Sequence, residues 1–189
     1  MTIRPATYVA ALCLAFTGNS WAESYTIDSK HTFPSFEISH LGFSTQRGRF
    51  DDTSGKIILN PKSEWGHIEV NIVADSIDTG LPELEAKLKG SDFFNTAKFT
   101  SINFNSKSVK FVGEKPIATE GTLTMLGISK PLLLTIENFH CGIHPISNRN
   151  ICGADASGLI KRSDFGMTAF LPMIGDEVKL KIQVEAFVE

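Results

Sequence analysis

The sequence predicts an all-β protein whose strands close into a barrel, with one short helix near one end. Most segments after Ser24 alternate apolar and polar residues, and only one segment has the pattern of a helix. The chain after residue 22 has thirteen Phe, against one Tyr and one Trp. Strands with one apolar face must bury it, against a second sheet or inside a closed barrel. Because Phe brings no polar group, such a barrel holds either a packed core or an apolar pocket, and that choice decides the function.

Residues 1–22 are predicted to be a cleaved secretory signal peptide. Arg4 is their only charged residue, an apolar run extends from Tyr8 to Phe16, and Ser20-Trp21-Ala22 has the small residues of a cleavage site. The run is too short to cross a bilayer as a helix. Cleavage after Ala22 would leave residues 23–189 as a single domain, and the loss of Arg4 would change the formal net charge from −3 to −4. This mild negative charge argues against a nucleic-acid partner.

Because Pro34 cannot donate to a strand ladder, the first predicted strand begins after Pro34 or bulges there. Phe36, Ile38 and His40 share one of its faces. The next strands are predicted at Arg47–Asp51, Lys56–Asn60 and Ile68–Ile72.

The segment Pro82–Gly90 is the predicted helix. Pro opens it, acidic residues come early, lysines come late and Gly ends it. Leu81, Leu84 and Leu88 form its apolar stripe. With Phe93–Phe94 just beyond, we expect this helix to lie across one end of the barrel.

The second half of the chain is predicted to contain strands only. The segments are Ile102–Phe104, Val109–Val112, Thr119–Met125, Leu132–Ile136, Ala154–Arg162 and Val178–Glu185. The last one is the clearest, because apolar and polar residues alternate at every step.

Two cysteines remain after the signal peptide, Cys141 and Cys152. Because exported chains meet oxidising conditions, we predict a disulfide that closes the loop Gly142–Ile151 and stabilises the fold by about 3 kcal/mol. The alternative is a metal site with His140 and His144. It is disfavoured because a structural zinc site needs four ligands and the CxxC-type spacing is missing, so no metal is expected.

Catalytic motifs are not found, so the chain is not expected to be an enzyme or to carry a cofactor. Asp164-Phe165-Gly166 matches a kinase tripeptide, but the Gly-rich loop, strand lysine and catalytic loop of kinases are missing. HExxH and GxSxG are also missing. His40 has no carboxylate or Ser that the sequence positions to work with it.

A series of short motifs extends along the chain, each weak by itself. They are His40-Leu41-Gly42-Phe43-Ser44, Gly48-Arg49-Phe50, Ser76-Ile77-Asp78-Thr79, Ser91-Asp92-Phe93-Phe94, Ile102-Asn103-Phe104-Asn105-Ser106, Gly121-Thr122-Leu123-Thr124-Met125-Leu126-Gly127, Arg162-Ser163-Asp164-Phe165-Gly166 and Ile174-Gly175-Asp176-Glu177-Val178. In this order they resemble the YceI-like family of exported bacterial proteins. The stretch Cys141–Asp155 is similar to a branch of that family with a disulfide hairpin.

The resemblance implies a lipocalin-like, eight-stranded antiparallel barrel with a long apolar tunnel, located in the periplasm. It also implies that the partner is a long-chain isoprenoid lipid, such as octaprenyl phosphate or a ubiquinone-type lipid. Eight strands leave room for one elongated ligand, so the residue pattern agrees with that shape. Lys87 stands where family members tend to have His, and it keeps a positive charge there.

The first hypothesis is a lipid-binding protein that transports, stores or sequesters this chain. Its predicted ligand-binding residues are Phe36, Ile38, His40, Phe43, Lys87, Phe93, Phe94, Phe104, Leu123, Met125, Leu134, Ile136, Phe165, Leu180 and Ile182. Burying hydrocarbon contributes about 0.8 kcal/mol per CH₂ before ordering costs, so few polar contacts are needed. Ordinary core packing is the alternative at each apolar position, because alternation does not distinguish a filled barrel from a hollow one.

Four cations are candidate contacts for an anionic head group, with solvated surface charge as the favoured alternative. They are Lys87, Lys89, Arg47 and Arg49. A tunnel mouth at Phe93 and Phe94 would be an apolar patch for transient membrane contact or for a homodimer.

The second hypothesis is a non-catalytic structural or interaction module. Its barrel would be packed, and the Cys141–Cys152 loop would recognise a partner, since loops on rigid sheets commonly carry binding. His144, Pro145 and Arg149 would then be the exposed contacts.

Overall fold

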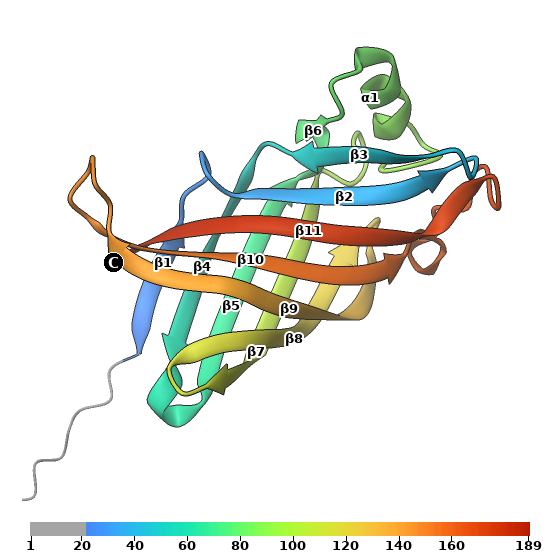
Figure 1. The fold of residues 1–189 in the computed structure, drawn as a ribbon. Coiled ribbons are helices and arrows are strands. Elements are labelled where there is room, and N and C mark those ends of the chain that lie inside the picture. The colour runs from blue at the N-terminus through green and yellow to red at the C-terminus, as the bar shows by residue number, and fades with distance from the viewer. Residues whose placement is uncertain (1–21) are drawn as a thin grey trace, which may run out of the picture.

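The computed structural model describes residues 22–189, which form a closed barrel of antiparallel strands (Figure 1). The predicted signal peptide lies outside the described residues apart from Ala22. In this part of the chain the strands are β1 (Glu23–Ile27), β2 (Phe33–His40), β3 (Ser44–Phe50), β4 (Thr53–Asn60), β5 (Trp65–Val73), β6 (Ile77–Asp78), β7 (Ser101–Val112), β8 (Lys115–Met125), β9 (Ile128–Ile143), β10 (Asn150–Lys161) and β11 (Ile174–Val188). Helix α1 spans Pro82–Lys89, and 3₁₀ turns span Pro61–Ser63 (η1), Ala74–Ser76 (η2) and Arg162–Phe165 (η3).

Eight of these strands form the ring. Their order is β1-β4-β5-β7-β8-β9-β10-β11, and β11 pairs back with β1, where Tyr25 lies opposite Val188. The predicted eight-stranded antiparallel barrel with a short helix is therefore confirmed. β1 and β6, of five and two residues, have no counterpart among the predicted strands.

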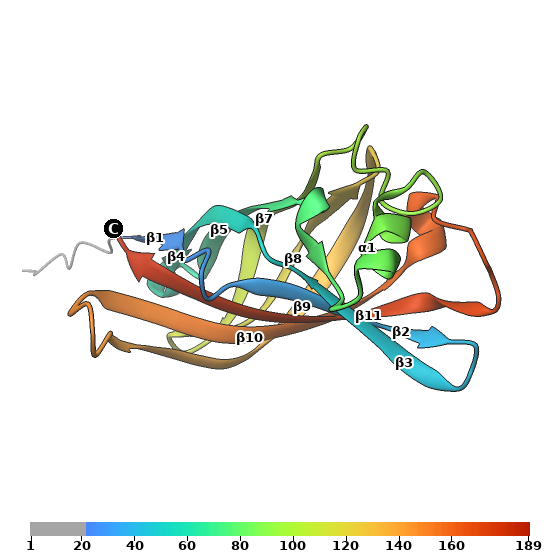
Figure 2. The ribbon, with the colours of Figure 1, turned by 90° about the horizontal axis from the view of Figure 1, so that it is seen from above.

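The hairpin of β2 and β3 extends the barrel at one end. β11 pairs with β1 through its last residues and with β2 through its earlier ones, from Ile174 to Gln183. β3 pairs with β2 and with the short β6, whereas β4, after a bend at Asp51–Asp52, pairs with β1 and β5. The β2–β3 hairpin thus diverges from the ring, as Figure 2 shows. β3 and β5 are not hydrogen-bonded to each other there, and we call this end of the barrel the open end.

Helix α1 lies at this open end, next to β6 (Figure 1). It has the predicted signals, with Pro82 in its first turn, Glu83 and Glu85 early, two lysines late and Gly90 as its C-cap. Its stripe is narrower than predicted, because Leu81 is the N-cap and is half exposed. Within residues 22–189, helices of the length and apolar content needed to cross a membrane are not found.

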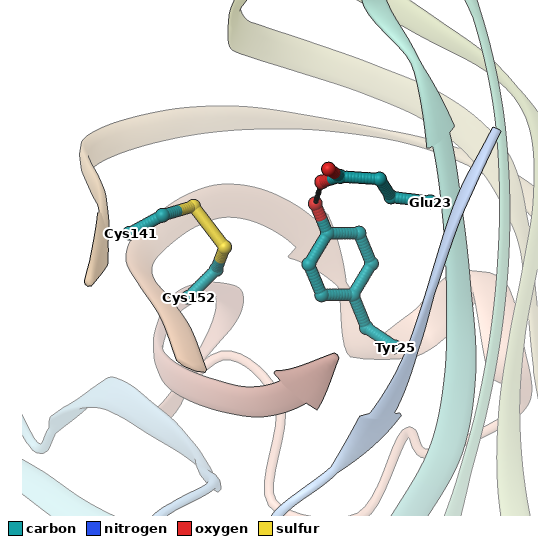
Figure 3. Close-up of a disulfide and its surroundings, with 4 residues drawn as sticks. All are labelled: Glu23, Tyr25, Cys141 and Cys152. Atoms are coloured by element: carbon teal, nitrogen blue, oxygen red, sulfur yellow. Dashed lines mark hydrogen bonds between the residues drawn. A yellow bond between two sulfur atoms is a disulfide. The ribbon is translucent and has the colours of Figure 1, made fainter. Parts of the chain in front are cut away.

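Cys141 and Cys152 form the predicted disulfide (Figure 3). It lies next to the β9–β10 turn, which Figure 1 shows at the end of the barrel opposite the β2–β3 turn. They are direct partners in the β9–β10 ladder, with a Cα–Cα distance of 4.0 Å. The strands continue beyond them to Ile143 and Asn150, so the connecting turn is shorter than the loop Gly142–Ile151 that the sequence predicts. The disulfide therefore ties two paired strands together.

Candidate functional site: an apolar cavity along the barrel

The barrel is hollow. A cavity of about 490 Å³ lies inside it, within the range of common small-molecule sites. Residues from the inward faces of all eight ring strands line it, together with β2, β3, α1 and the loop before β11. The hollow interior contradicts the packed barrel on which the interaction-module hypothesis depends.

The lining is predominantly apolar. Seven Phe contribute, and they are Phe36, Phe50, Phe93, Phe94, Phe104, Phe139 and Phe170. On β11 the lining positions run from Ile174 to Ala186, which spans about 40 Å at the usual rise of a strand. Asp and Glu are missing from the lining contributed by residues 22–189, where Lys87 and Arg162 are the charged members.

Thirteen of the fifteen predicted ligand-binding residues line this cavity. They are Phe36, Ile38, His40, Lys87, Phe93, Phe94, Phe104, Leu123, Met125, Leu134, Ile136, Leu180 and Ile182. The structure thus brings them together, while their contact with a ligand stays a prediction.

Phe43 does not line the cavity, so the tunnel position predicted for it is wrong. Leu41 and Gly42 adopt left-handed φ angles of 54° and 74°, which turn the chain from β2 into β3. Phe43 is the last residue of this turn, and 91% of its side chain is exposed. Alternation along a strand does not show where the strand ends, and the prediction failed for that reason.

Phe165 is also absent from the lining. It closes the 3₁₀ turn η3 and is 2% exposed, which means that it packs in the core. Gly166 follows it with a left-handed φ of 85° that a side chain would strain. The predicted tunnel position of Phe165 is therefore corrected to a structural one.

Arg162 organises the loop that follows η3. Its side chain is 2% exposed, and its guanidinium donates hydrogen bonds to four backbone carbonyls, two in that loop and two in the first residues of β11. The acceptors are Gly175 O at 2.8 Å, Met167 O at 3.0 Å, Ala169 O at 2.8 Å and Ile174 O at 3.1 Å. Burial lowers the pKa of Arg162 from its ordinary value. The loop between η3 and β11 is thus held from inside by one cation.

Asp176 anchors the same region from the other side. It accepts from the Ser163 amide at 2.9 Å and from the Ser163 hydroxyl at 2.8 Å. These two bonds, the amide first, hold the pKa of Asp176 below its ordinary value.

Lys87 and aromatic rings form the rim of the open end. The Lys87 ammonium lies 4.4 Å from the centroid of the Phe170 ring, a cation–π distance. Phe170 stacks on Phe93 with centroids 6.1 Å apart and an interplanar angle of 15°. The loop before β11 therefore contacts both α1 and the segment that follows it.

The other three candidate head-group cations lie outside the cavity lining and pair with carboxylates. Arg47 bonds Glu37 at 2.8 Å, Arg49 bonds Asp51 at 2.7 Å and Lys89 approaches Asp75 at 3.5 Å. Of the four predicted cations, Lys87 is the one in a position to meet a ligand.

Two polar residues stand out in the lining. Tyr25, near the disulfide, donates to Glu23 at 2.5 Å (Figure 3), and burial together with that carboxylate raises its pKa. Thr53 is 0% exposed, and its hydroxyl has no hydrogen-bond partner among residues 22–189. A buried hydroxyl without a hydrogen-bond partner lowers the stability of the folded state.

The profile of the YceI-like domain matches residues 25–186, almost the whole described chain. The chain belongs to the YceI-like family. Protein YceI of Salmonella arizonae is 35% identical over 181 residues, which cover 94% of each chain.

Two solved structures share the YceI-like fold. BcnA of Burkholderia cenocepacia superposes with a TM-score of 0.72 at 20% identity, over 84% of this chain and 98% of that one. A polyisoprenoid binding domain from Saccharophagus degradans gives a TM-score of 0.66 at 18% identity, over 87% and 98% of the two chains. At these identities the likeness is one of fold.

The sequence did not lead us to predict the structural role of Arg162 or the unpartnered hydroxyl of Thr53. Arg162 opens a motif that was used for resemblance alone. A signal was present, since Arg162 lies three residues before a stretch without charged residues, from residue 165 to 175, whose backbone groups need partners. The sequence around Thr53 gave no such indication, because only the folded interior shows that its hydroxyl has no hydrogen-bond partner among residues 22–189.

Proposed function

We propose that this protein binds a long polyisoprenoid chain in its barrel and transports, stores or sequesters it in the periplasm. The ligand would be a polyprenyl phosphate or a ubiquinone-type lipid, held by its hydrocarbon chain. The signal-like segment at residues 1–22 supports the compartment.

The observation that carries this proposal is the long apolar cavity. An unoccupied apolar space forfeits the dispersion contacts that its lining would otherwise make. A hydrocarbon chain supplies them and contributes about 0.8 kcal/mol per buried CH₂ before ordering costs. The shared fold of the Saccharophagus degradans polyisoprenoid binding domain supports the choice of an isoprenoid.

The charge distribution supports a head-group site at the open end of the barrel. Lys87 lies at the rim, and carboxylates are missing from the lining that residues 22–189 provide. An anionic head group would therefore meet a cation there. His40 lines the cavity without a carboxylate beside it in the lining, which favours binding over acid–base catalysis.

The test is mass spectrometry of an organic extract from protein purified out of the periplasm without detergent. We expect one polyprenyl species in stoichiometric amount. An empty extract, together with no uptake of added isoprenoid lipid, would refute the proposal.

A matched pair of variants links the lipid to the cavity. Ala156 lines the cavity on β10, whereas its neighbour Ser157 does not. Ala156→Phe should fill part of the space and reduce the bound lipid, while Ser157→Phe should leave the amount unchanged. Equal retention in both variants would place the lipid elsewhere.

A further inference from the structure

Two loops at the open end form one exposed apolar surface, here called the rim patch. It consists of Leu41, Phe43, Phe170 and Met173, which are 46%, 91%, 42% and 58% exposed. The Leu41 amide donates to Met173 O at 2.9 Å, so the tip of β2–β3 adjoins the loop before β11. Figures 1 and 2 both show these two loops side by side at the same end.

Charge is missing from both loops. Residues 38–46 and 165–175 contain no Asp, Glu, Lys or Arg, in a chain of which 21% is charged. Asp176, the first acid after the second segment, is bonded to Ser163. An exposed apolar surface without charges is expensive in water and is expected where a protein meets an apolar partner.

The rim patch is continuous with the cavity. Leu41, Phe170 and Met173 are partly exposed and also line the interior. Lys87, whose ammonium lies 4.4 Å from the Phe170 ring centroid, is the cation beside this apolar surface. Apolar side chains with an adjacent cation complement a bilayer interface, where acyl chains lie beneath phosphate groups.

We propose that the rim patch inserts into the surface of an anionic phospholipid bilayer. An isoprenoid chain would then pass between bilayer and cavity without crossing water. This inference rests on the proposed function and adds the source from which the lipid is taken.

The patch is held in shape before it meets a membrane. Arg162 bonds four carbonyls of the second loop, and the Leu41–Met173 bond joins the two loops. Little ordering is therefore required on binding, which favours insertion by only a few side chains.

The test uses sedimentation with sucrose-loaded vesicles of phosphatidylcholine alone or mixed with phosphatidylglycerol, free of isoprenoid. Phe43→Asp should reduce vesicle binding by about ten- to a hundredfold, since burying one Phe contributes roughly 1.5–3 kcal/mol and about 1.4 kcal/mol corresponds to a factor of ten. Ile146→Asp is the matched control, because Ile146 is 89% exposed but lies in the β9–β10 turn at the other end. It should bind as the unmodified protein does, and mixed vesicles should bind more tightly than neutral ones.

Tryptophan fluorescence is a second readout, and it tests directly whether position 43 contacts the bilayer. Phe43→Trp should show a blue-shifted emission with vesicles and quenching by brominated lipid, whereas Ile146→Trp should show neither. Absence of vesicle binding, or equal loss in Phe43→Asp and Ile146→Asp, would overturn the proposal. So would a dimer in ultracentrifugation that Phe43→Asp disrupts without any vesicle binding.

The outcomes separate this inference from the proposed function. A protein that holds isoprenoid but ignores vesicles refutes the membrane contact alone. A protein that binds vesicles through Phe43 but neither contains nor takes up isoprenoid refutes the lipid-holding function alone.

Discussion

Replacing Arg162 by Met tests whether one buried guanidinium holds the open end of the barrel in shape. Met retains much of the apolar stem of Arg but donates no hydrogen bond. The substitution removes four N–H···O bonds of 2.8–3.1 Å and leaves four carbonyls without this donor. These carbonyls lie between Met167 and Gly175, in the loop before β11 and in the first two residues of β11, and Phe170 and Met173 of that loop line the cavity.

The expected loss follows from these four bonds. A hydrogen bond from a charged donor contributes about 1.5–3 kcal/mol. Part of that sum is offset, because Met also removes the cost of burying a charge. We expect the free energy of unfolding to fall by about 3–5 kcal/mol, which lowers Tm by roughly 10 °C for a domain of this size.

Thermal and urea unfolding followed by circular dichroism would measure this effect. Arg49→Met is the matched control, because Arg49 pairs with Asp51 at 2.7 Å but is 46% exposed. It should lose less than about 1 kcal/mol. A loss for Arg162→Met no larger than that of Arg49→Met would refute the view that burial and four acceptors make Arg162 structural.

Three further predictions concern the head group, the cavity wall and acid stability. Lys87→Ala should weaken binding of a polyprenyl phosphate and leave a ubiquinone-type lipid unaffected, as measured by competition for the purified barrel. Thr53→Val should raise the free energy of unfolding by about 1 kcal/mol in urea titrations, because it removes a buried hydroxyl without a partner. Bonds from Lys56, then Ser24 and Thr26, lower the pKa of Glu189 from 4.5 to about 2. Since the charged form is favoured in the folded state, this contribution is complete above pH 4.5 and is lost as the pH falls toward 2, so Glu189→Gln should flatten the fall in Tm over that window.

Two of these predictions have a control variant within the chain, and each has an outcome that would contradict it. Lys89→Ala should change neither lipid, because Lys89 approaches Asp75 and does not line the cavity. Equal loss of both lipids in Lys87→Ala would contradict a head-group role. Thr119→Val should destabilise the protein, since the Thr119 hydroxyl bonds Ser106 and Ser108 O at 2.9 Å; destabilisation by Thr53→Val as well would show that Thr53 has a partner. An unchanged acid limb in Glu189→Gln would show that its contacts do not persist in solution.

Local features of this protein could be predicted from its sequence. The alternation in Val178–Glu185 identified a strand with one buried face, and the order of Pro, acids, lysines and Gly identified α1. Both patterns depend on interactions within a few residues, so neighbouring residues suffice to specify them. The pairing of Cys141 with Cys152 followed from their being the two cysteines left after the signal peptide.

The interior of the barrel depended on residues that are far apart in the chain. Strand pairing around the whole ring determines whether the inward side chains fill the barrel. The ring closes where β1 pairs with β11, and these two strands lie near opposite ends of the sequence. The positions of Phe43, at the end of a turn, and Phe165, inside η3, depended on where strands end. Arg162 acquired its role because folding brings four carbonyls, from the loop before β11 and the start of β11, around its guanidinium. Alternation therefore determined which side chains point inward, whereas closure of the ring and the path of its loops determined that they surround a space.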